Sequence, residues 1–502
     1  MAHTCVAFAR RALAVVMMTS LLALAPACAS RERAAADDAR RPNIIYIMAD
    51  DHAAHALSCY GSRINRTPNL DRLASQGVRF TNAFCTNSIC TPMRAVILTG
   101  QYSHKNGVRD NSGVLPLDAF TVPMALAPKG YQTAHIGKWH LNRTPSGFDH
   151  WDILPGQGRY MDPEFITREH GTRVHAGYVT DITLDKAMDW IGARDQSRPF
   201  LLYCHLKAPH REWTPDPKHA AMFAGADVPV PATFDDDYAT RTAAARIQTM
   251  TIEHHLTPID LKQPPPAGLD ARALKHWKYQ RYIKDYLGCI ASIDDNVGRL
   301  MQFLDEQNLS DDTVVIYTSD QGFFLGDHGW YDKRFMYEES LRFPLIVRYP
   351  REIPAGTVCD AMVTTLDYAP TFLDFGGIDA GRAADAMRHE LDGRSFRPLL
   401  REPTHPPGDW RTSVYYHYYE SGEPHTVPKH YGVRTRRYKL IRFYELPGGE
   451  AAQWELYDLE RDPHELKNLA GTPEHAEVES TLRRELVRLR AQFNDTTGAP
   501  LK

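Results

Sequence analysis

The chain has 502 residues, of which 43% are apolar and 24% are charged, as is ordinary for a folded globular protein. This length suffices for one large α/β domain and a smaller one. The formal net charge of −4 and the lack of a long Lys/Arg run argue against nucleic-acid binding, which needs a basic surface. An anionic substrate would therefore need a local basic pocket.

The amino terminus has the pattern of an export signal at residues 1–29. A positive flank precedes an apolar core at Ala12–Ala25, which is too short to span a bilayer, and a small-residue cleavage site follows. The sequence Leu-Ala-Pro-Ala-Cys that ends at Cys28 resembles a bacterial lipoprotein box, so Cys28 is a candidate lipid anchor. Residues 30–41 read as a polar linker. We expect an exported protein that is periplasmic, attached to the outer membrane or secreted.

Four short apolar runs have the pattern of strands that are buried on both faces, and polar residues follow each of them. The runs are Asn43–Met48, Tyr131–Ile136, Pro199–Leu206 and Thr313–Ser319. Helical patterns lie between them, among them Thr180–Ile191 and Tyr279–Leu304. This alternation predicts an α/β fold with a large, mostly parallel sheet sandwiched by helices, in a large domain at residues 42–403. Open sheets of this kind bind ligands at the carboxyl ends of their strands.

The composition changes near residue 403, and residues 404–502 are predicted to form a smaller carboxy-terminal α+β subdomain. Its expected antiparallel sheet and packing helix come from the segments Val414–Tyr419, Tyr431–Tyr444, Trp454–Leu459 and Glu477–Phe493. Residues 225–275 show little periodicity and are interpreted as an insertion over the site or a long loop. The cysteines after the leader have no regular spacing, so a disulfide scaffold is not expected, although Cys59 and Cys85 are candidates for a pair.

Three carboxylates follow the ends of two predicted strands, Asp50 and Asp51 after the first and Asp320 after the last. Converging carboxylates repel one another and cannot all stay ionised without a cation. An all-oxygen ligand set favours Ca²⁺ or Mg²⁺, and Gln321 can add an amide oxygen. An isolated Asp-Asp pair is more often a helix cap or a solvated turn, but its convergence with Asp320 favours a metal site.

A set of cationic side chains accompanies the carboxylates, namely Arg94, Lys138, His140, His210 and Lys333. Each of them alone would be read as a solvated surface group or an ordinary loop histidine. Most of them, however, lie just past a predicted strand, and so on the same edge of the sheet as the carboxylates. A metal ion with several fixed cations suits an ester of a tetrahedral anion, whose transition state spreads charge over its oxygens.

The stretch from Cys90 to Gly100 reads Cys-Thr-Pro-Met-Arg-Ala-Val-Ile-Leu-Thr-Gly. Thr91 is expected to cap a helix that Gly100 ends, which places Cys90 just before the helix, where an anion is favoured. A small residue at a tight turn is the alternative reading of Cys-x-Pro-x-Arg alone. The full run resembles the signature of the type I, formylglycine-dependent sulfatases of the alkaline-phosphatase-like superfamily, in which this cysteine is oxidised to formylglycine (3-oxoalanine).

The resemblance extends from Asp50 to the carboxy-terminal sheet and implies a role for each polar residue. The implied ligands of one Ca²⁺, with Mg²⁺ as the alternative ion, are Asp50, Asp51, Asp320, Gln321 and the modified Cys90. The family more often has Asn at the position of Gln321. Arg94 and Lys138 would hold the formylglycine hydrate, and His140 would take part in proton transfer. His210 and Lys333 would hold the sulfate, with His210 also a candidate acid for the leaving oxygen.

The resemblance also implies a mechanism and a maturation partner. One hydroxyl of the hydrated aldehyde attacks sulfur and expels the alcohol, and the other then loses its proton so that the aldehyde reforms and sulfate leaves. An unmodified cysteine has no second hydroxyl, so a formylglycine-generating enzyme is an expected partner during maturation.

The substrate is expected to be a sulfated carbohydrate, as in glycosaminoglycan degradation. Lys207–Trp213 and His430–Thr435 look like the N-acetylglucosamine-6-sulfatase branch of the family, and His430 and Arg434 are candidate sugar contacts, with ordinary sheet residues as the alternative. Two other functions stay open: a formylglycine-dependent phosphonate monoester or phosphodiester hydrolase, and a non-catalytic secreted glycan-binding protein. The intact Cys90 run argues against the latter, because a binding protein needs no oxidisable cysteine.

Overall fold

The computed structural model describes residues 41–501 except 63, 382–388 and 423–424. The predicted export signal, Cys28 and nearly all of the predicted linker lie outside the described residues. Residues 43–502 group into one compact unit, and the boundary between residues 403 and 404 stays a prediction. Among the described helices, none is long and apolar enough to cross a membrane.

Within the described part of the chain, ten strands form the central sheet. Their order across the sheet is β13 (Thr357–Cys359), β2 (Val78–Phe80), β12 (Leu345–Arg348), β9 (Thr313–Ser319), β1 (Asn43–Ala49), β8 (Phe200–His205), β4 (Gln132–Lys138), β5 (His150–Leu154), β6 (Glu164–Thr167) and β7 (Gly171–Val174). The five central strands, from β9 to β5, are parallel to one another. On one side of these five strands, β12 pairs antiparallel with both β9 and β2. On the other side, β6 pairs antiparallel with both β5 and β7. The predicted parallel sheet is therefore the centre of a mixed one.

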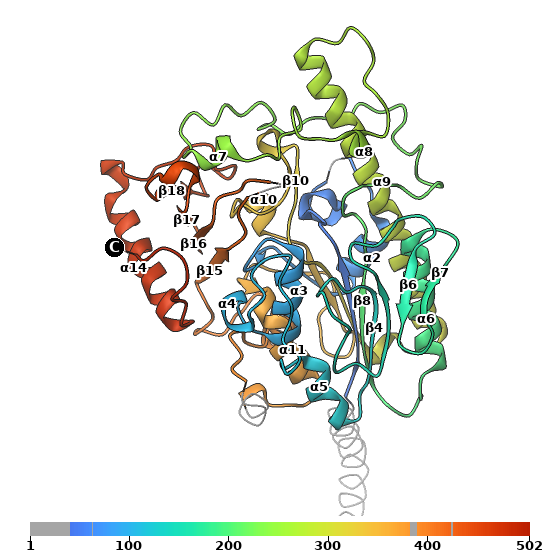
Figure 1. The fold of residues 1–502 in the computed structure, drawn as a ribbon. Helices are drawn as coiled ribbons and strands as arrows, with labels where there is room; N and C mark the ends of the chain where they lie inside the picture. Colours follow the sequence, from blue (N-terminus) through green and yellow to red (C-terminus); the bar gives the residue numbers. More distant parts are fainter. Residues whose placement is uncertain (1–40, 63, 382–388, 423–424, 502) are drawn as a thin grey trace, which may run out of the picture. The chain divides into compact units, whose positions relative to one another are not determined.

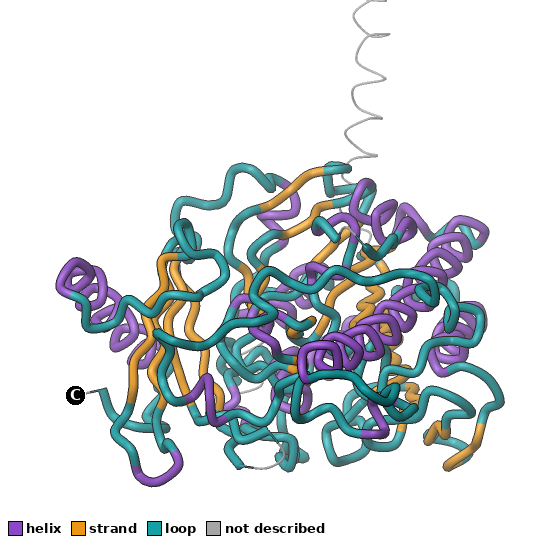
Figure 2. Tube along the Cα trace, turned by 90° about the horizontal axis from the view of Figure 1, so that it is seen from above, coloured by secondary structure: helices purple, strands orange, loops and turns teal. Residues whose placement is uncertain are grey.

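The central strands are buried on both faces, as their continuous apolar runs predict. In β1, Ile44, Tyr46 and Met48 pack into one core, while Ile45 and Ile47 pack into the other. The second core is formed with α2 (Pro68–Ser75), α6 (Val179–Ala193) and the long α9 (Ala271–Glu306), which contacts both of the others. The first core includes α3 (Cys90–Thr99), α5 (Val122–Leu126) and α11 (Tyr368–Phe375). Helices thus cover both faces of the sheet, as Figure 2 shows from above.

A four-stranded antiparallel sheet follows, with β15 (Ser413–Tyr418), β16 (His430–Thr435), β17 (Tyr438–Phe443) and β18 (Gln453–Asp458) in chain order. The helix α14 (Ala476–Gln492) packs on it, as predicted (Figure 1). The aromatic segment at 431–444 is two strands rather than one, because the chain turns at Arg436 and Arg437. The other face of this sheet joins the first core, so both of its faces are covered.

The remaining strands and α-helices of the described residues are short and lie in the connections, which also carry 3₁₀ helices. They are β3 (Ala83–Phe84) with β14 (Val363–Thr364), the hairpin of β10 (Phe324–Leu325) and β11 (Tyr331–Asp332), and the helices α4 (Ser103–Asn106), α7 (Ala244–Ile247), α8 (Pro258–Leu261), α10 (Glu338–Leu341) and α13 (Arg397–Arg401). The predicted insertion at 225–275 is mostly loop and carries α7 and α8. All six described cysteines are free, so the suggested pairing of Cys59 with Cys85 is wrong. Cys85 instead lies with its Sγ against the carbonyl of Ser340.

Candidate active site

The carboxyl ends of β9, β1, β8 and β4 form one edge of the sheet, and the predicted polar residues lie there. The last residues of β1 and β9 are in register, so Asp50 and Asp320 follow neighbouring strand ends. Lys138 is the last residue of β4, and His210 lies on the loop that follows β8. The prediction that four strands deliver their polar residues to one edge is confirmed.

The three carboxylates converge because the backbone turns sharply after β1. Asp51 has φ 68°, in the left-handed region that non-glycine residues rarely adopt. In an extended strand, successive side chains point to opposite faces, whereas this turn brings both Asp50 and Asp51 to the same place. One oxygen from each of Asp50, Asp51 and Asp320 lies within 4.8 Å of the others, and all three residues are buried. Asp320 Oδ1 also accepts hydrogen bonds from the backbone N–H groups of Asp51 (3.2 Å) and Gln321 (3.1 Å).

Cys90 is the first residue of α3, and its side chain faces the carboxylates. Its Sγ lies 3.6 Å from Asp50 Oδ1, 3.3 Å from Lys333 Nζ and 3.9 Å from Gln321 Nε2. Gly100 ends the helix at φ 67°, as predicted. The predicted cap is wrong, because the helix begins at Cys90 and the hydroxyl of Thr91 pairs with His140 Nδ1 at 3.3 Å.

Three cations surround the carboxylates. Lys333 Nζ lies 2.6 Å from both carboxylate oxygens of Asp51, and Lys138 Nζ donates to Asp50 Oδ2. Arg94, which is 1% exposed, reaches Asp50 at 3.5 Å and Asp320 at 3.4 Å, and it donates to the carbonyl of Lys138 at 2.7 Å. Three cations and three carboxylates thus form one buried network.

The three carboxyl groups differ in the direction in which the site shifts their pKa values. Burial would raise the pKa of Asp50, but the positive charges of Lys138 and Arg94 hold that pKa well below its ordinary value. Burial raises the pKa of Asp51 to about 6 despite Lys333, and burial together with the Asp50 charge raises the pKa of Asp320 to about 7. Burial also raises the pKa of the Cys90 thiol to about 12, so an unmodified Cys90 is neutral and a poor nucleophile here.

The two predicted histidines lie on either side of this network. His210 Nε2 is 3.8 Å from Asp51 Oδ2, and His210, Cys90 and Asp50 together offer ligand atoms within 4.8 Å of one another. His140 lies further out, beside Thr91. Burial, and then Lys138, lower the pKa of His140 to about 2 and that of His210 well below its ordinary value. Both rings are therefore neutral in the protein without substrate.

Gln157 is a site residue that the sequence analysis missed. Its Oε1 accepts from Lys138 Nζ, and its Nε2 lies 3.3 Å from His140 Nε2, so one amide connects two predicted catalytic groups. The loop that carries it follows β5, a strand that was not predicted. The flanking Gly156 and Gly158 mark a turn, but only the fold brings it to this edge.

Gln321 fits the predicted metal-ligand set. It lies beside Asp320 at the strand end, and its Nε2 is 2.6 Å from Asp51 Oδ1. Its Oε1 is buried without a hydrogen-bond partner among the described residues, so an acceptor is spare at the carboxylate cluster. Buried acceptors are nearly always paired, and a hard cation among oxygen ligands would use such an atom.

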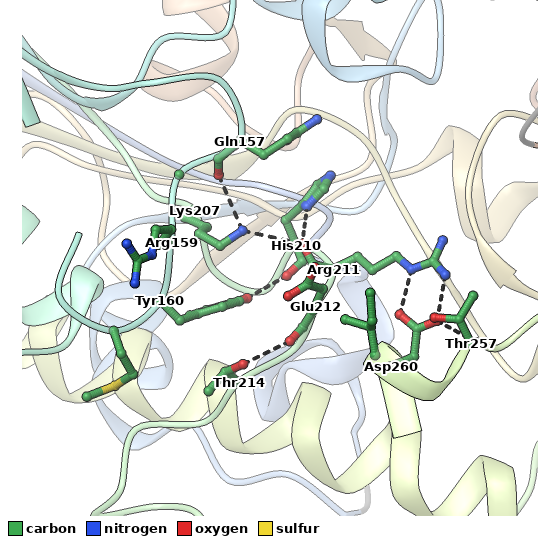
Figure 3. A pocket seen from close by; sticks show the side chains of 13 residues that line it. Gln157, Arg159, Tyr160, Lys207, His210, Arg211, Glu212, Thr214, Thr257 and Asp260 are labelled. Carbon is green, nitrogen blue, oxygen red and sulfur yellow. Dashed lines mark hydrogen bonds and ion pairs between the residues drawn. The ribbon is translucent and has the colours of Figure 1, made fainter. Parts of the chain in front are cut away.

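A cavity of about 630 Å³ lies next to the network, with His210 in its wall (Figure 3). Gln157 and Lys207 line it from the sheet edge, and Thr257 and Asp260 line it from the 225–275 insertion. The insertion therefore forms one wall of the cavity next to the site, in keeping with its predicted place. A space of this size is in the range of small-ligand pockets.

The structure does not bring His430 and Arg434 to this cavity. His430 is fully buried on β16, where it stacks on Tyr416 and its Nδ1 lies 2.8 Å from the carbonyl of Pro428. Arg434 is 5% exposed and pairs with Glu338 at 3.2 Å. These contacts are those of packed sheet residues, and the sugar-binding role of the two stays a prediction.

Comparisons with known proteins agree with this architecture. The sulfatase family matches residues 42–378, and the family described as N-sulphoglucosamine sulphohydrolase, C-terminal, matches residues 326–492. A protein of Bacteroides thetaiotaomicron, named N-acetylglucosamine-6-O-sulfatase, is 42% identical to this chain over 93% of this chain and 89% of its own length.

Solved structures give the same result. A protein in complex with its substrate D-glucosamine-2-N,6-O-disulfate has a TM-score of 0.87 at 43% identity, covering 91% of this chain and 99% of that one. The phosphonate monoester hydrolase of Agrobacterium radiobacter has a TM-score of 0.70 at 23% identity, over 90% and 96% of the two chains, and shows the shared fold alone. The protein therefore belongs to the sulfatase family of the alkaline-phosphatase-like superfamily, and is a sulfatase.

Proposed function

We propose that this sulfatase removes the 6-O-sulfate from N-acetylglucosamine or a related glucosamine unit of a sulfated glycan, as in glycosaminoglycan degradation. The observation that carries the proposal is the meeting of Cys90 with a carboxylate cluster and three cations beside a sugar-sized cavity. The relative at 42% identity and the glucosamine-disulfate complex support the choice of sugar.

The carboxylate cluster is the proposed site of a divalent cation, with Ca²⁺ preferred and Mg²⁺ as the alternative. Asp50, Asp51, Asp320 and Gln321 would hold it together with residue 90, and the spare Gln321 oxygen fits a cation bound by oxygen ligands. A bound cation would supply positive charge that keeps the carboxylates ionised and favours the deprotonated nucleophile.

The nucleophile is proposed to come from residue 90, where a formylglycine-generating enzyme would oxidise Cys90 during maturation. The hydrated aldehyde would supply a hydroxyl to attack sulfur and a second hydroxyl whose loss of a proton releases the sulfate. The neutral, buried thiol of Cys90 lacks both features, which supports the need for oxidation. Cys90 Sγ marks the position from which the modified side chain would act.

The surrounding residues orient the reacting groups and balance the charge on sulfate. Lys333 lies nearest to residue 90, where it can hold a sulfate oxygen, and Arg94 and Lys138 fix the carboxylates that face the same atom. Fixed cations of this kind stabilise the charge that develops on the sulfate oxygens in the transition state. Gly137, next to Lys138, allows the close approach of β4 and β8, since a Cβ there would lie 1.9 Å from the carbonyl oxygen of His205.

The leaving sugar oxygen needs a proton, and His210 is the proposed donor. It belongs both to the network and to the cavity wall, so it lies between the sulfur position and the space for the sugar. Binding of the anionic sulfate ester beside His210 would favour the protonated form of the ring, because an opposite charge within a few ångströms raises the pKa of a histidine.

Turnover of matched substrates by one preparation tests this function. We expect release of inorganic sulfate from N-acetylglucosamine-6-sulfate at a kcat/KM at least a hundredfold above that for an aryl phosphonate monoester or an aryl phosphodiester. Faster turnover of the phosphonate would favour the phosphonate-hydrolase alternative. Binding of the sulfated sugar without turnover, in protein that carries formylglycine, would favour the glycan-binding alternative.

A further inference from the structure

An ion pair joins the catalytic loop after β8 to the 225–275 insertion. The guanidinium of Arg211 donates to both oxygens of Asp260, from Nε at 2.6 Å and from an Nη at 2.5 Å (Figure 3). Asp260 is fully buried and also accepts from the backbone N–H (2.7 Å) and hydroxyl (2.8 Å) of Thr257, which caps α8. The Arg211 guanidinium carbon lies 5.3 Å from the ring centroid of Tyr331. Asp260 therefore holds Arg211 in one position.

The backbone of Arg211 in turn contacts the proposed acid. His210 Nδ1 donates to the carbonyl oxygen of Arg211 at 2.6 Å, which assigns the Nδ1 proton and leaves Nε2 toward Asp51 and the reaction centre. Lys207 Nζ donates to the same carbonyl at 3.3 Å, and the hydroxyl of Tyr160 donates to the carbonyl of His210 at 2.6 Å. The orientation of the His210 ring thus depends on where the Arg211 carbonyl is held.

We propose that Arg211 and Asp260 are positioning residues for His210, through the hydrogen bond from His210 Nδ1 to the Arg211 carbonyl. The insertion would then contribute to catalysis as well as to the cavity wall. This inference rests on the proposed function, because it takes His210 to protonate the leaving oxygen. A ring held within a few tenths of an ångström and some ten degrees of its working geometry transfers a proton efficiently, whereas a mobile ring does so less often.

The test is the dependence of rate on the leaving group, with aryl sulfates of graded phenol pKa, which have no sugar to contact the cavity. A poor leaving group needs protonation and a good one does not. We expect Asp260→Asn to lower kcat/KM about tenfold or more for the poorest leaving group and less than about threefold for 4-nitrophenyl sulfate, so that the plot against leaving-group pKa becomes steeper. Arg211→Lys, which keeps the positive charge but cannot form the bidentate ion pair with Asp260, should give an intermediate slope.

The chain offers a matched control in the pair of Arg411 with Asp367. Asp367 is also fully buried, also accepts two hydrogen bonds from one guanidinium, and also caps a short helix through Thr364, but it lies in the segment after β14. Asp367→Asn should reproduce any loss of stability with an unchanged slope. Equal slopes for Asp260→Asn, Arg211→Lys and the wild type, in folded protein, would overturn the inference.

A double variant separates this inference from the proposed function. If Asp260 acts through His210, adding Asp260→Asn to His210→Ala should change the slope no further. A further steepening would show that Asp260 acts by another route and would refute the inference. A His210→Ala variant with the wild-type slope would instead refute the acid role of His210. If His210→Ala gives a steep slope while Asp260→Asn and Arg211→Lys keep the wild-type slope, the acid role of His210 stands and only the positioning role of Arg211 and Asp260 is rejected.

Discussion

Replacing Gln157 with leucine removes an amide that contacts both Lys138 and His140. Its oxygen accepts from the Lys138 ammonium, and its nitrogen faces His140 at 3.3 Å. A hydrogen bond to a charged group contributes about 1.5–3 kcal/mol and a neutral one about 0.5–1.5 kcal/mol. Because Lys138 keeps its contact with Asp50, we expect a loss of about 1.5–3 kcal/mol of transition-state stabilisation. This corresponds to a fall of about 10- to 150-fold in kcat/KM.

Steady-state sulfate release from N-acetylglucosamine-6-sulfate and from 4-nitrophenyl sulfate measures this loss. The formylglycine content of each preparation is determined in parallel. Gln280→Leu is the matched control, because both ends of the Gln280 amide also form hydrogen bonds, here with the backbone of Val228, away from the site. We expect Gln280→Leu to lower stability and leave kcat/KM unchanged. A Gln157→Leu enzyme within about threefold of the wild type on both substrates would refute the role given to Gln157.

Three further predictions concern the metal site and stability. Asp320→Ala should abolish turnover while the circular dichroism spectrum stays native. Exhaustive chelation should also abolish turnover, with loss of the metal confirmed by elemental analysis. Full activity of the chelated enzyme would contradict a catalytic cation. Arg434→Ala should lower the free energy of unfolding by about 2–3 kcal/mol and keep aryl sulfatase activity. This loss is smaller than the ~3–5 kcal/mol typical of a broken buried pair, because Lys439 still pairs with Glu338. Unchanged denaturant stability with a loss of glycan turnover alone would instead restore its sugar-binding role. Burial would lower the pKa of His328, but its carboxylate partners raise it to about 9. The protonated ring therefore contributes fully to stability below pH 6.5, and this contribution is lost as the pH rises through 9. His328→Gln should remove that loss from thermal unfolding curves, and an unchanged pH dependence would contradict the pairing.

The sequence predicted the sheet edge well because its signal is local. A strand buried on both faces must be a continuous apolar run, and the residues at its carboxyl end are read directly from the chain. Asp50, Lys138, His210 and Asp320 were found in this way, and the structure brings all four to one edge. Because these strands pair in parallel, their carboxyl ends lie side by side, and this brings the four residues together.

Residues whose roles depend on distant contacts could not be predicted. Gln157 lies on a polar loop, and nothing near it in the sequence indicates that Lys138 and His140 are its neighbours. His430 and Arg434 lie on a strand that is covered on both faces, by α14 and by the first core, so alternation could not show which side chains reach a ligand. Thr91 has the composition of a helix cap, but its hydroxyl is used by His140 instead.

Mass spectrometry of the peptide that carries residue 90 tests most directly whether Cys90 reacts as formylglycine. Preparations made with and without a co-expressed formylglycine-generating enzyme would span a range of conversion. We predict that sulfate release from N-acetylglucosamine-6-sulfate rises in proportion to the aldehyde fraction and extrapolates to zero at zero conversion. Full activity in protein that carries only the thiol at Cys90 would contradict it.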